Sequence, residues 1–511
     1  MTTPRARTPR VGIIGTGFSG VAVAAELQRR GITSFTMLEK ASEVGGVWRD
    51  NTYPGAACDV PSHLYSFSWA KKADWSLKFA PQAEIIAYLR DVVDQLGLHP
   101  HIELGVEVTR AVWDRHTATW TCHLADGTTR TFEVLVTGTG QLNRPSIPRF
   151  PGLEDFAGDH FHSARWDHDL DLTGRRVVVV GTGASAIQFV PYLADHADHV
   201  TVVQRSAPWV VHKPDRPYTE VERSAFAKLP GYATAYRASL YWRSEGRWPA
   251  FSGNKLGGWA ATRMATRHLE AAVDDPQLRE VLTPDYPIGC KRILQSDEWY
   301  PTLARDHVDV VQGGVATIEP DAVRLADGTR LPCDTIVWGT GFRTTEFLAP
   351  IEVIGRDGTE LNEAWRDGAE AYLGIEVAGF PNLFVMYGPN TNLGHNSIIF
   401  MLERQARYVG SAVRTLVDRD LASVEVRTDT YRRYNDRLQA RLRDSLFSSC
   451  DSWYVDDNGR IVNNWVGTTL EYTWRTWRFD VHDHHAVRRR ELPVAPPAPA
   501  APRATPAEVP A

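Results

Sequence analysis

The sequence predicts an α/β fold that contains two copies of one strand–turn–helix–strand unit. The first copy is RVGIIGTGFSGVAVAAELQRRGITSFTMLEK, which begins at Arg10, and the second is RRVVVVGTGASAIQFVPYLADHADHVTVVQRS, which begins at Arg175. In each copy a short run of Val and Ile precedes a glycine-rich turn, a pattern typical of buried parallel strands. Because strands and helices alternate, we expect parallel sheets with helices on their faces.

The first unit has the glycine spacing of a dinucleotide-binding turn. Gly15, Gly17 and Gly20 form GxGxxG. The first glycine permits the tight turn, the second lets the backbone approach a pyrophosphate, and the third lets the helix pack closely. Glu39 stands 24 residues after Gly15, at the end of the second strand. Its carboxylate would accept hydrogen bonds from ribose hydroxyls and repel a 2′-phosphate, so the ligand predicted here is FAD or NAD.

The second unit differs from the first at one informative position. Gly181, Gly183 and Ala186 form GxGxxA, and the residue 24 places after Gly181 is Arg205. A guanidinium there can pair bidentately with a 2′-phosphate, which favours NADP. The alternative is a solvated charge at the end of a strand. A chain with both kinds of site is most simply a flavoprotein that takes hydride from NADPH.

Two further strands and several shifts in composition outline the domains. FEVLVTGTG (132–140) and DTIVWGTGF (334–342) also end in glycine turns, which lie at the edge of an open sheet where α/β proteins bind ligands. We therefore expect two Rossmann-like dinucleotide-binding domains, for FAD and NADP, with a helical insertion. The expected boundaries are 8–148 and 336–487 for the FAD domain, 149–173 for a linker, 174–206 and 286–335 for the NADP domain, 207–285 for the insertion, and 488–511 for a disordered Pro/Ala-rich tail.

Composition limits the classes of partner. A net charge of −6 without a basic domain argues against nucleic acid, and no apolar run reaches the roughly 18 to 20 residues of a membrane span. No signal peptide fits before the first strand, so we expect a cytoplasmic protein. The cysteines are scattered and form no CxxC pair, so we expect a reducing compartment and no structural disulfide, zinc site or iron–sulfur cluster. These cysteines are Cys58, Cys122, Cys290, Cys333 and Cys450.

The stretch FAGDHFHSARWD (156–167) contains two histidines, His160 and His162, on alternating positions. A metal site is one interpretation, but no Cys or His stands at zinc-like spacing from them. A catalytic triad is another, but it lacks a positioned nucleophile. Because the stretch lies just before the second unit, we interpret it as part of the connection between two domains, where His162 would control their movement or support the structure.

The same stretch resembles the fingerprint of type I Baeyer–Villiger monooxygenases, F-x-G-x-x-x-H-x-x-x-W-(P/D). The matching residues are Phe156, Gly158, His162, Trp166 and Asp167. Flavin-containing monooxygenases that oxidise nitrogen and sulfur have a shorter pattern without the Trp-Asp ending. The resemblance continues through EVGGVWRDNTYPGAACDVPSHLYSFS, YPIGCKRILQSDEWYPTL, GTGF, FPNLFVMYGPNTNLGHNSIIFMLERQARY and CDSWY. The chain thus resembles class B flavoprotein monooxygenases over most of residues 8–480.

The resemblance implies roles for individual residues. Arg292 is similar to the active-site arginine beside the flavin and nicotinamide, oriented by Asp59; the alternative is a structural ion pair. Lys291 would be a second cation for the NADP phosphate. Further contacts with FAD are expected from Ser19, Gly45, Gly46, Val47, Trp48, Tyr65 and Val108. Further contacts with NADP are expected from Ala184, Ser185 and Ser206.

The implied activity is an FAD- and NADPH-dependent Baeyer–Villiger oxygenation, which inserts one atom of O₂ into a ketone through a flavin C4a-peroxide and gives an ester or lactone. A fixed guanidinium would stabilise the anionic peroxide and stay protonated beside it. The nearest alternative is an N- or S-oxygenase on the same scaffold. A pyridine-nucleotide disulfide reductase lacks its CxxC here, and a non-enzymatic redox protein is a remaining alternative. The aromatic insertion and CDSWYVDDNGR suggest a pocket for an apolar ketone; the alternative is that these aromatic residues belong to an ordinary core. No pattern indicates an oligomeric state.

Overall fold

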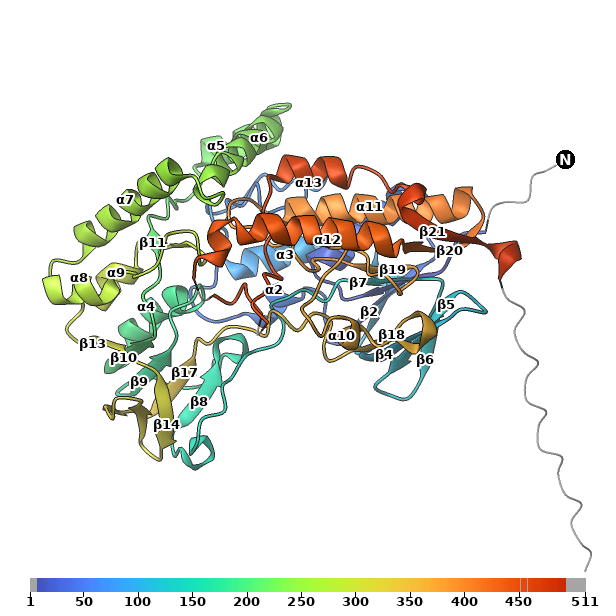
Figure 1. Cartoon of the computed structure of the whole chain (residues 1–511). Coiled ribbons are helices and arrows are strands. Elements are labelled where there is room, and N and C mark those ends of the chain that lie inside the picture. The colour runs from blue at the N-terminus through green and yellow to red at the C-terminus, as the bar shows by residue number, and fades with distance from the viewer. Residues whose placement is uncertain (1–6, 451, 457, 493–511) are drawn as a thin grey trace, which may run out of the picture.

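Two five-stranded parallel sheets organise the protein (Figure 1). The computed structural model describes residues 7–450, 452–456 and 458–492. The strand orders are β19-β7-β1-β2-β3 in the first sheet and β13-β10-β9-β17-β8 in the second, and every pairing within them is parallel. The predicted α/β fold is therefore confirmed.

The first sheet is assembled from distant parts of the chain. Its strands are β1 (Val11–Ile14), β2 (Phe35–Glu39), β3 (Ile102–Leu104), β7 (Val134–Thr137) and β19 (Leu383–Val385). Its long helices are α1 (Phe18–Arg29), α3 (Gln82–Gln95) and α11 (Ile398–Asp418). The central strands β1 and β7 are mostly apolar, and every residue in them is buried because helices cover the sheet. Residues from both ends of the sequence thus build one domain.

The second sheet includes part of the fingerprint stretch. Its strands are β8 (Asp159–His162), β9 (Arg176–Val180), β10 (His199–Gln204), β13 (Val308–Gln312) and β17 (Thr335–Trp338). The helices beside it are α4 (Ala186–His196), α8 (Pro276–Leu282) and α9 (Trp299–Leu303). β8 is an edge strand, and its register places His162 opposite Trp338. A segment that we expected to be a linker therefore also belongs to a sheet.

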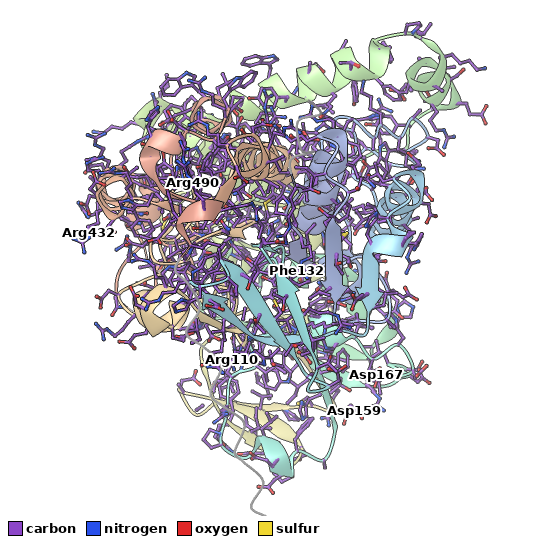
Figure 2. All side chains as sticks on the ribbon, turned by 90° about the vertical axis from the view of Figure 1, so that its right-hand side faces the viewer. Arg110, Phe132, Asp159, Asp167, Arg432 and Arg490 are labelled. Carbon is purple, nitrogen blue, oxygen red and sulfur yellow. A yellow bond between two sulfur atoms is a disulfide. The ribbon has the colours of Figure 1, made fainter. Side chains whose placement is uncertain are left out.

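The helical insertion forms a ridge that projects from the body of the molecule (Figures 1 and 2). It contains α5 (Glu220–Lys228), α6 (Tyr232–Glu245), the 3₁₀ turn η4 (Trp248–Ala250) and α7 (Lys255–Ala272). The short strands β11 (Val210–Val211) and β12 (Leu294–Gln295) pair in parallel and bring the two ends of the insertion together. The insertion therefore starts and ends beside the segment that contains Arg292.

The remaining elements lie around the first sheet and beside the second. The small sheets contain β4 (Val108–Asp114), β5 (Thr119–Leu124), β6 (Thr129–Phe132), β18 (Glu352–Ile354), β14 (Val315–Glu319), β15 (Ala322–Leu325), β16 (Arg330–Pro332), β20 (Leu421–Val426) and β21 (His484–Arg488). The other helices are α2 (Val47–Asp50), α10 (Leu361–Ala364), α12 (Thr428–Arg443) and α13 (Thr469–Arg475). The 3₁₀ turns are η1 (His99–His101), η2 (Leu153–Asp155), η3 (Ser163–Arg165), η5 (Arg356–Gly358), η6 (Leu446–Ser448), η7 (Val481–Asp483) and η8 (Arg489–Glu491).

The C-terminal boundary lies later than we expected from composition. Arg488 is the last residue of β21, which pairs with β20, and a 3₁₀ turn follows it. The end of this strand and the turn therefore include residues 488–491, which we had assigned to the tail from their composition. The rest of the expected tail, 493–511, lies outside the described residues.

The expectation of no disulfide is wrong for one pair of cysteines. Cys290 and Cys450 are bonded, with their Cα atoms 6.1 Å apart, although 160 residues separate them in the sequence. Spacing along the chain could not reveal this pair, because only the fold brings the two loops together. Cys58, Cys122 and Cys333 are free and buried.

In the described part of the chain, no helix is long and apolar enough to cross a membrane.

Candidate functional site

The first glycine turn is closely packed against a second one. Gly15 has φ +100°, and a Cβ there would stand 2.7 Å from the carbonyl oxygen of Gly138, in the turn after β7. A Cβ at Gly20 would stand 2.0 Å from the carbonyl oxygen of Gly15. The sequence pointed to both turns separately, and the structure shows that one supports the other. Larger side chains at these positions would push the turn out of shape.

Glu39 lies directly beneath this turn. Its carboxylate accepts hydrogen bonds from the Thr16 backbone N–H (3.1 Å) and hydroxyl (2.7 Å), and from the Ala41 N–H (3.0 Å). The guanidinium of Arg49 lies 3.3 Å away. These contacts fix the carboxylate at the end of β2 next to the turn, where we predicted a ribose partner.

The predicted flavin-side loop meets the first glycine turn. Gly45 and Gly46 both have positive φ, and a Cβ at Gly17 would lie 3.7 Å from the Cα of Gly46. Trp48 follows Val47 in α2, and its indole N–H donates to the Tyr65 hydroxyl at 3.0 Å. The structure therefore brings the two predicted FAD-binding segments together. Because both residues at the contact are glycines, no side chain separates the two backbones. Such close backbone approach fits a dinucleotide that runs from the turn into the loop.

Two other residues predicted to contact FAD are buried around the same sheet. Ser19 lies in the first turn of α1 and Val108 is the first residue of β4. Ser19 is 6% exposed and Val108 is 5% exposed. Both residues therefore lie in the first domain. Ser19 is next to the second glycine turn, because a Cβ added to Gly138 would be 3.3 Å from the Ser19 Cβ.

The second glycine turn repeats the arrangement of the first. Gly181 has φ +108°, and a Cβ there would stand 2.5 Å from the carbonyl oxygen of Gly339, in the turn after β17. A Cβ at Gly183, by contrast, would meet no atom within 4 Å. Ala184 and Ser185 follow, and α4 begins at Ala186. The open space at Gly183 beside the start of an eleven-residue helix fits a pyrophosphate.

The predicted phosphate-binding cations lie near each other. Arg205 is exposed directly after β10, and Ser206 follows it. The Lys291 ammonium donates to the Ser206 hydroxyl at 3.1 Å and lies 4.4 Å from the centre of the Tyr286 ring. Two positive side chains, one after β10 and one before β12, therefore flank the edge of the second sheet. This arrangement suits a 2′-phosphate.

Arg292 and Asp59 form an ion pair between the two domains. One guanidinium nitrogen of Arg292 donates to a carboxylate oxygen of Asp59, 233 positions away in the sequence. The side chains are 38% and 33% exposed, so the pair remains accessible. Gln295 donates to the Asp59 carbonyl at 3.3 Å and holds the backbone of the same loop. The structure thus joins the two residues that we predicted to act together.

The electrostatics of this pair keep both groups charged. Burial of the Asp59 carboxylate raises its pKa, but the charge and hydrogen bond of Arg292 outweigh this, and the net pKa lies below the ordinary value. The charge of Asp59 raises the pKa of Arg292, against a smaller opposing effect of burial. Arg292 is therefore a permanent cation held in a fixed orientation.

A contact between the domains positions Asp59, and no motif in the sequence indicated it. Gln188 on α4 accepts a hydrogen bond from the Tyr53 hydroxyl (2.9 Å) and donates to the Ala57 carbonyl (3.0 Å). A Cβ at Gly55 would stand 2.3 Å from the Gln188 carbonyl oxygen. The segment between α2 and Asp59 is thereby docked on the helix that begins at the second glycine turn.

Two tyrosines near Arg292 were also missing from the predicted site. Burial raises the pKa of Tyr454 to about 12, and burial likewise raises the pKa of Tyr387; the Arg292 charge partly opposes both shifts. The Tyr387 hydroxyl donates to Asn392 at 2.8 Å. Both stand in segments that carry the family resemblance, YGPN and CDSWY, and only the fold shows that they approach the arginine.

The fingerprint residues support the structure of the connection between the domains. His162 is 1% exposed; its Nδ1 accepts from the Ala164 N–H (3.1 Å) and its Nε2 lies 2.9 Å from the Gly341 carbonyl oxygen. Because Nδ1 is an acceptor, Nε2 has the proton and the ring is neutral. Burial lowers the pKa of His162 and favours this state.

The other fingerprint residues pack against neighbouring elements or form local turns. Trp166 contacts Phe161 and Phe189, with ring centres 5.1 and 5.3 Å apart respectively. Phe156 packs in the apolar cluster that includes Trp338. A Cβ at Gly158 would meet the Asp334 carbonyl oxygen at 2.2 Å, and Asp167 accepts from the Asp169 N–H at 3.0 Å.

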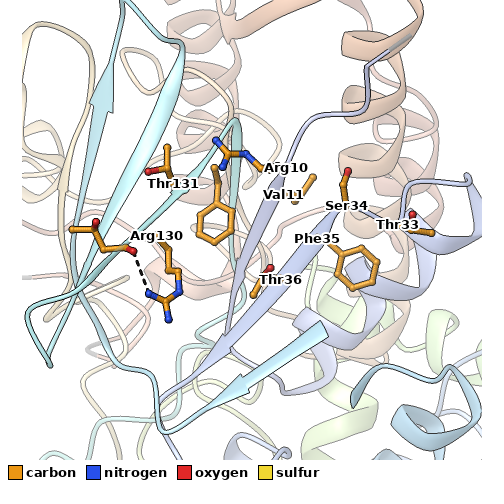
Figure 3. A pocket seen from close by; sticks show the side chains of 10 residues that line it. Arg10, Val11, Thr33, Ser34, Phe35, Thr36, Arg130 and Thr131 are labelled. Carbon is orange, nitrogen blue, oxygen red and sulfur yellow. Dashed lines mark hydrogen bonds between the residues drawn. The ribbon is translucent and has the colours of Figure 1, made fainter. Parts of the chain in front are cut away.

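One pocket lies at the end of the first sheet opposite its glycine turns. It has a volume of about 400 Å³ and lies between the start of β1, the start of β2 and strand β6 (Figure 3). The glycine turn is at the other end of β1, so this pocket is remote from the predicted FAD site. No group of three or more His, Cys, Asp or Glu suited to a metal occurs among the described residues.

Comparison with known proteins identifies the family. Residues 8–221 match the family model described as flavin-binding monooxygenase-like. A "Baeyer-Villiger monooxygenase" of Streptomyces coelicolor is 44% identical over 484 residues, which cover 94% of this chain and 93% of the relative. The chain belongs to the Baeyer–Villiger monooxygenases. A relative of the same name from Pseudomonas aeruginosa is 42% identical over 487 residues, which cover 95% of this chain and 92% of the relative.

Solved structures show the same architecture. The structure described as "Oxidized steroid monooxygenase bound to NADP" has a TM-score of 0.84 and 30% identity, and the match covers 94% of this chain and 100% of that one. The two-sheet arrangement of this Baeyer–Villiger monooxygenase is therefore that of its family, and the fold and family that the sequence predicted are both confirmed.

Proposed function

We propose that the protein inserts one oxygen atom of O₂ into an apolar ketone and releases an ester or lactone, with FAD and NADPH as cofactors. The observation that carries this proposal is the Asp59–Arg292 ion pair at the junction of two dinucleotide-binding domains. Arginine cannot lose its charge at any physiological pH. A fixed cation at this place stabilises negative charge on a reacting oxygen, which is what nucleophilic attack on a carbonyl needs.

The two glycine turns divide the cofactors between the domains. Gly15, Gly17 and Gly20 with Glu39 would hold FAD, and Gly181, Gly183 and Arg205 with Lys291 would hold NADPH. When bound, these cofactors supply the electrons that activate O₂. The open position at Gly183 and the backbone-only approach between Gly17 and Gly46 support this division.

The residues around Arg292 would orient its charge. Asp59 holds one side of the guanidinium, and Gln188 holds the Asp59 segment against α4. Because the pKa of Asp59 is lowered, its carboxylate stays ionised at neutral pH and the orientation persists. Tyr387 and Tyr454 stay protonated beside the cation, since burial raises both pKa values.

The setting and partners of the enzyme are part of the same proposal. The free thiols of Cys58, Cys122 and Cys333 support a reducing, cytoplasmic compartment, although Cys290 and Cys450 are bonded. The partners would be a small ketone and O₂, and the charge distribution argues against nucleic acid.

The decisive test offers the purified protein a panel of cyclic and aryl ketones together with an amine and a sulfide. We expect a yellow protein that oxidises NADPH in the presence of ketone, with products heavier than the ketone by one oxygen and with the mass spectrum of an ester or lactone. Products found only from the amine or sulfide would replace this proposal with heteroatom oxygenation. A protein that binds no flavin would overturn it altogether.

A further inference from the structure

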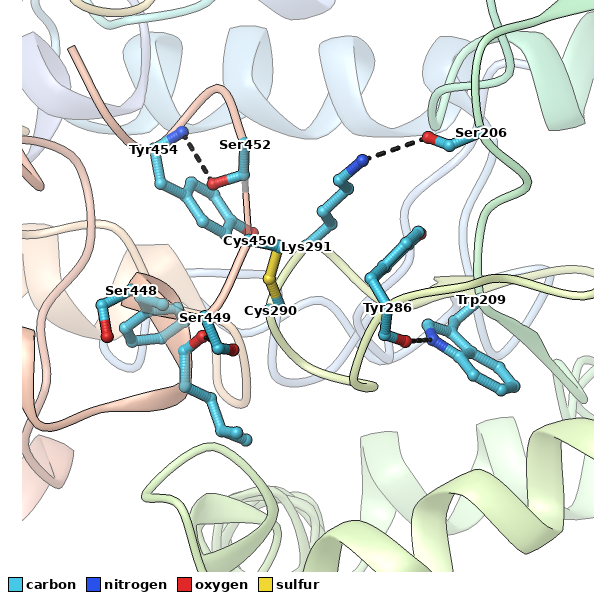
Figure 4. Close-up of a disulfide and its surroundings, with 12 residues drawn as sticks. Ser206, Trp209, Tyr286, Cys290, Lys291, Ser448, Ser449, Cys450, Ser452 and Tyr454 are labelled. Atoms are coloured by element: carbon cyan, nitrogen blue, oxygen red, sulfur yellow. Dashed lines mark hydrogen bonds between the residues drawn. A yellow bond between two sulfur atoms is a disulfide. The ribbon is translucent and has the colours of Figure 1, made fainter. Parts of the chain in front are cut away.

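The disulfide joins the two dinucleotide domains next to the predicted active site (Figure 4). Cys290 lies between α8 and β12, in the second domain, and Lys291 and Arg292 follow it directly. Cys450 lies after η6, in the C-terminal part of the first domain, four residues before Tyr454. The Cα separation of 6.1 Å is within the usual range for a disulfide.

Each end of this bond adjoins residues of the predicted site. On one side Lys291 reaches Ser206 and Arg292 reaches Asp59. On the other side Tyr454 is buried against Phe447, with ring centres 5.6 Å apart. The bond therefore ties the loop that holds the cation to the segment that packs beside it.

The other contacts that we describe between the domains are reversible. The Asp59–Arg292 pair and the Gln188 hydrogen bonds break and reform as the domains move. A covalent bond between Cys290 and Cys450 limits that motion. Domain movements commonly set turnover in enzymes that bind a nucleotide between two domains.

Geometry selects these two cysteines, because the fold brings Cys290 and Cys450 within bonding distance, whereas Cys58, Cys122 and Cys333 are free and buried. Cys450 is half-buried, whereas Cys290 is fully buried. An oxidant would therefore reach Cys450 first and find Cys290 beside it as the second thiol.

We propose that Cys290 and Cys450 form a reversible redox site, which a hydroperoxide closes and a dithiol opens, and that closure slows turnover by fixing the Arg292 loop to the segment before Tyr454. The Cys450 thiolate attacks hydrogen peroxide and becomes a sulfenic acid, with loss of hydroxide. The Cys290 thiolate then attacks that sulfur, forms the S–S bond and releases a second hydroxide. The two thiol protons convert these hydroxides to water, so two thiols lose two electrons in total and one peroxide gains them. A dithiol reverses the change by disulfide exchange.

The first test locates the bond. The protein, Cys450→Ser and the matched control Cys333→Ser are reduced, treated with hydrogen peroxide, blocked with an alkylating agent and digested with trypsin. We expect one linked pair of peptides, 280–291 with 444–460, in the unaltered chain and in Cys333→Ser, and none in Cys450→Ser. Full alkylation of both peptides after peroxide would overturn the proposal. This readout does not depend on oxygenation, so it stands apart from the proposed function.

The second test measures the effect of closure on turnover. After removal of peroxide, the oxidised protein should oxidise NADPH with saturating ketone about threefold more slowly than the reduced protein, and dithiothreitol should restore the rate. Cys333→Ser should respond in the same way, and Cys450→Ser should have equal rates in both treatments. FAD content and melting temperature show that each variant is folded. A linked peptide pair with unchanged turnover would overturn the proposed control of rate.

Discussion

Arg292 has a charge that pH does not remove, and Asp59 determines where that charge lies. The side chain of Arg292 is 38% exposed and that of Asp59 is 33% exposed, so their attraction adds little to the stability of the fold. Their value is positional, because a fixed donor stabilises developing charge better than mobile water does. The chemistry of the protein should therefore respond to Arg292 more strongly than its stability does.

Replacing Arg292 separates the two halves of the reaction. In Arg292→Ala we expect anaerobic flavin reduction by NADPH to continue, whereas ester formation falls by about 100-fold or more, since the cation that stabilises the oxygen anion is gone. Stopped-flow absorbance measures the first step and product mass analysis the second. Arg292→Lys is the control, because it keeps the charge but loses the fork that pairs with Asp59. Unchanged ester formation in Arg292→Ala would reject the assigned role.

Arg205 should determine which nicotinamide cofactor the protein prefers. In Arg205→Ala we expect the ratio of kcat/KM for NADPH to kcat/KM for NADH to fall about tenfold, because a charge-assisted contact with the 2′-phosphate is lost. FAD content should not change. Arg432→Ala, an exposed arginine on α12, is the matched control and should leave the ratio as it is. An unaltered ratio in Arg205→Ala would show that Arg205 is an ordinary surface charge with no role in cofactor preference.

At the scale of elements, each glycine turn is supported by the turn at the end of a neighbouring strand. The turn after β7 lies against Gly15, and the turn after β17 lies against Gly181. The same arrangement therefore occurs in both sheets, once in each predicted cofactor site. Within the second turn, however, Gly181 is tightly packed against protein atoms and Gly183 is not. We therefore expect substitution of Gly181 to affect folding and substitution of Gly183 to affect binding.

Two neighbouring substitutions in the second turn should have different effects. Gly181→Ala forces a Cβ to 2.5 Å from the Gly339 carbonyl oxygen at φ +108°, so we expect a melting temperature lower by several degrees. Gly183→Ala meets no protein atom within 4 Å, so we expect a normal melting temperature but a KM for NADPH raised about tenfold, because the methyl group occupies ligand space. Calorimetry and initial rates measure the two effects. A normal KM in Gly183→Ala would place the cofactor elsewhere.

Local patterns predicted the elements because apolar strands, glycine turns and helices each have a signature of a few residues. Glu39 and Arg205 were found by counting along such a unit. Contacts between distant loops have no such signature: nothing in the sequence near Gln188 or Cys450 indicates that they meet Tyr53 or Cys290. The pairing of Asp59 with Arg292 came from the family resemblance, since 233 residues separate them.

For the molecule as a whole, a buried cluster of polar groups attaches the helical insertion to the body. Glu245, at the end of α6, accepts hydrogen bonds from Asn396 (2.9 Å) and from the Thr469 N–H and hydroxyl (both 2.8 Å). His395 lies 3.4 Å from the same carboxylate. These partners come from the segment before α11 and from the start of α13, so one carboxylate connects three parts of the chain.

This attachment should weaken in acid. Burial raises the pKa of Glu245, but its hydrogen bonds outweigh burial and lower the pKa from 4.5 to about 2. The stability that this gives is complete above pH 4.5 and is lost as pH falls through the window down to about 2. We therefore expect the melting temperature of Glu245→Gln to be lower than that of the unaltered chain at pH 7, with the gap narrowing as pH falls below 4.5.

The measurement is a set of calorimetric or fluorescence melts from pH 7 towards pH 3 on the full chain. Glu220→Gln is the control, because Glu220 is exposed on α5 in the same insertion and its loss should leave the two curves parallel. Proteolysis adds a local readout: cleavage within 220–272 should accelerate in Glu245→Gln at neutral pH, before the body unfolds. A constant gap in melting temperature across this range of pH would show that the ionised carboxylate does not hold the insertion in place.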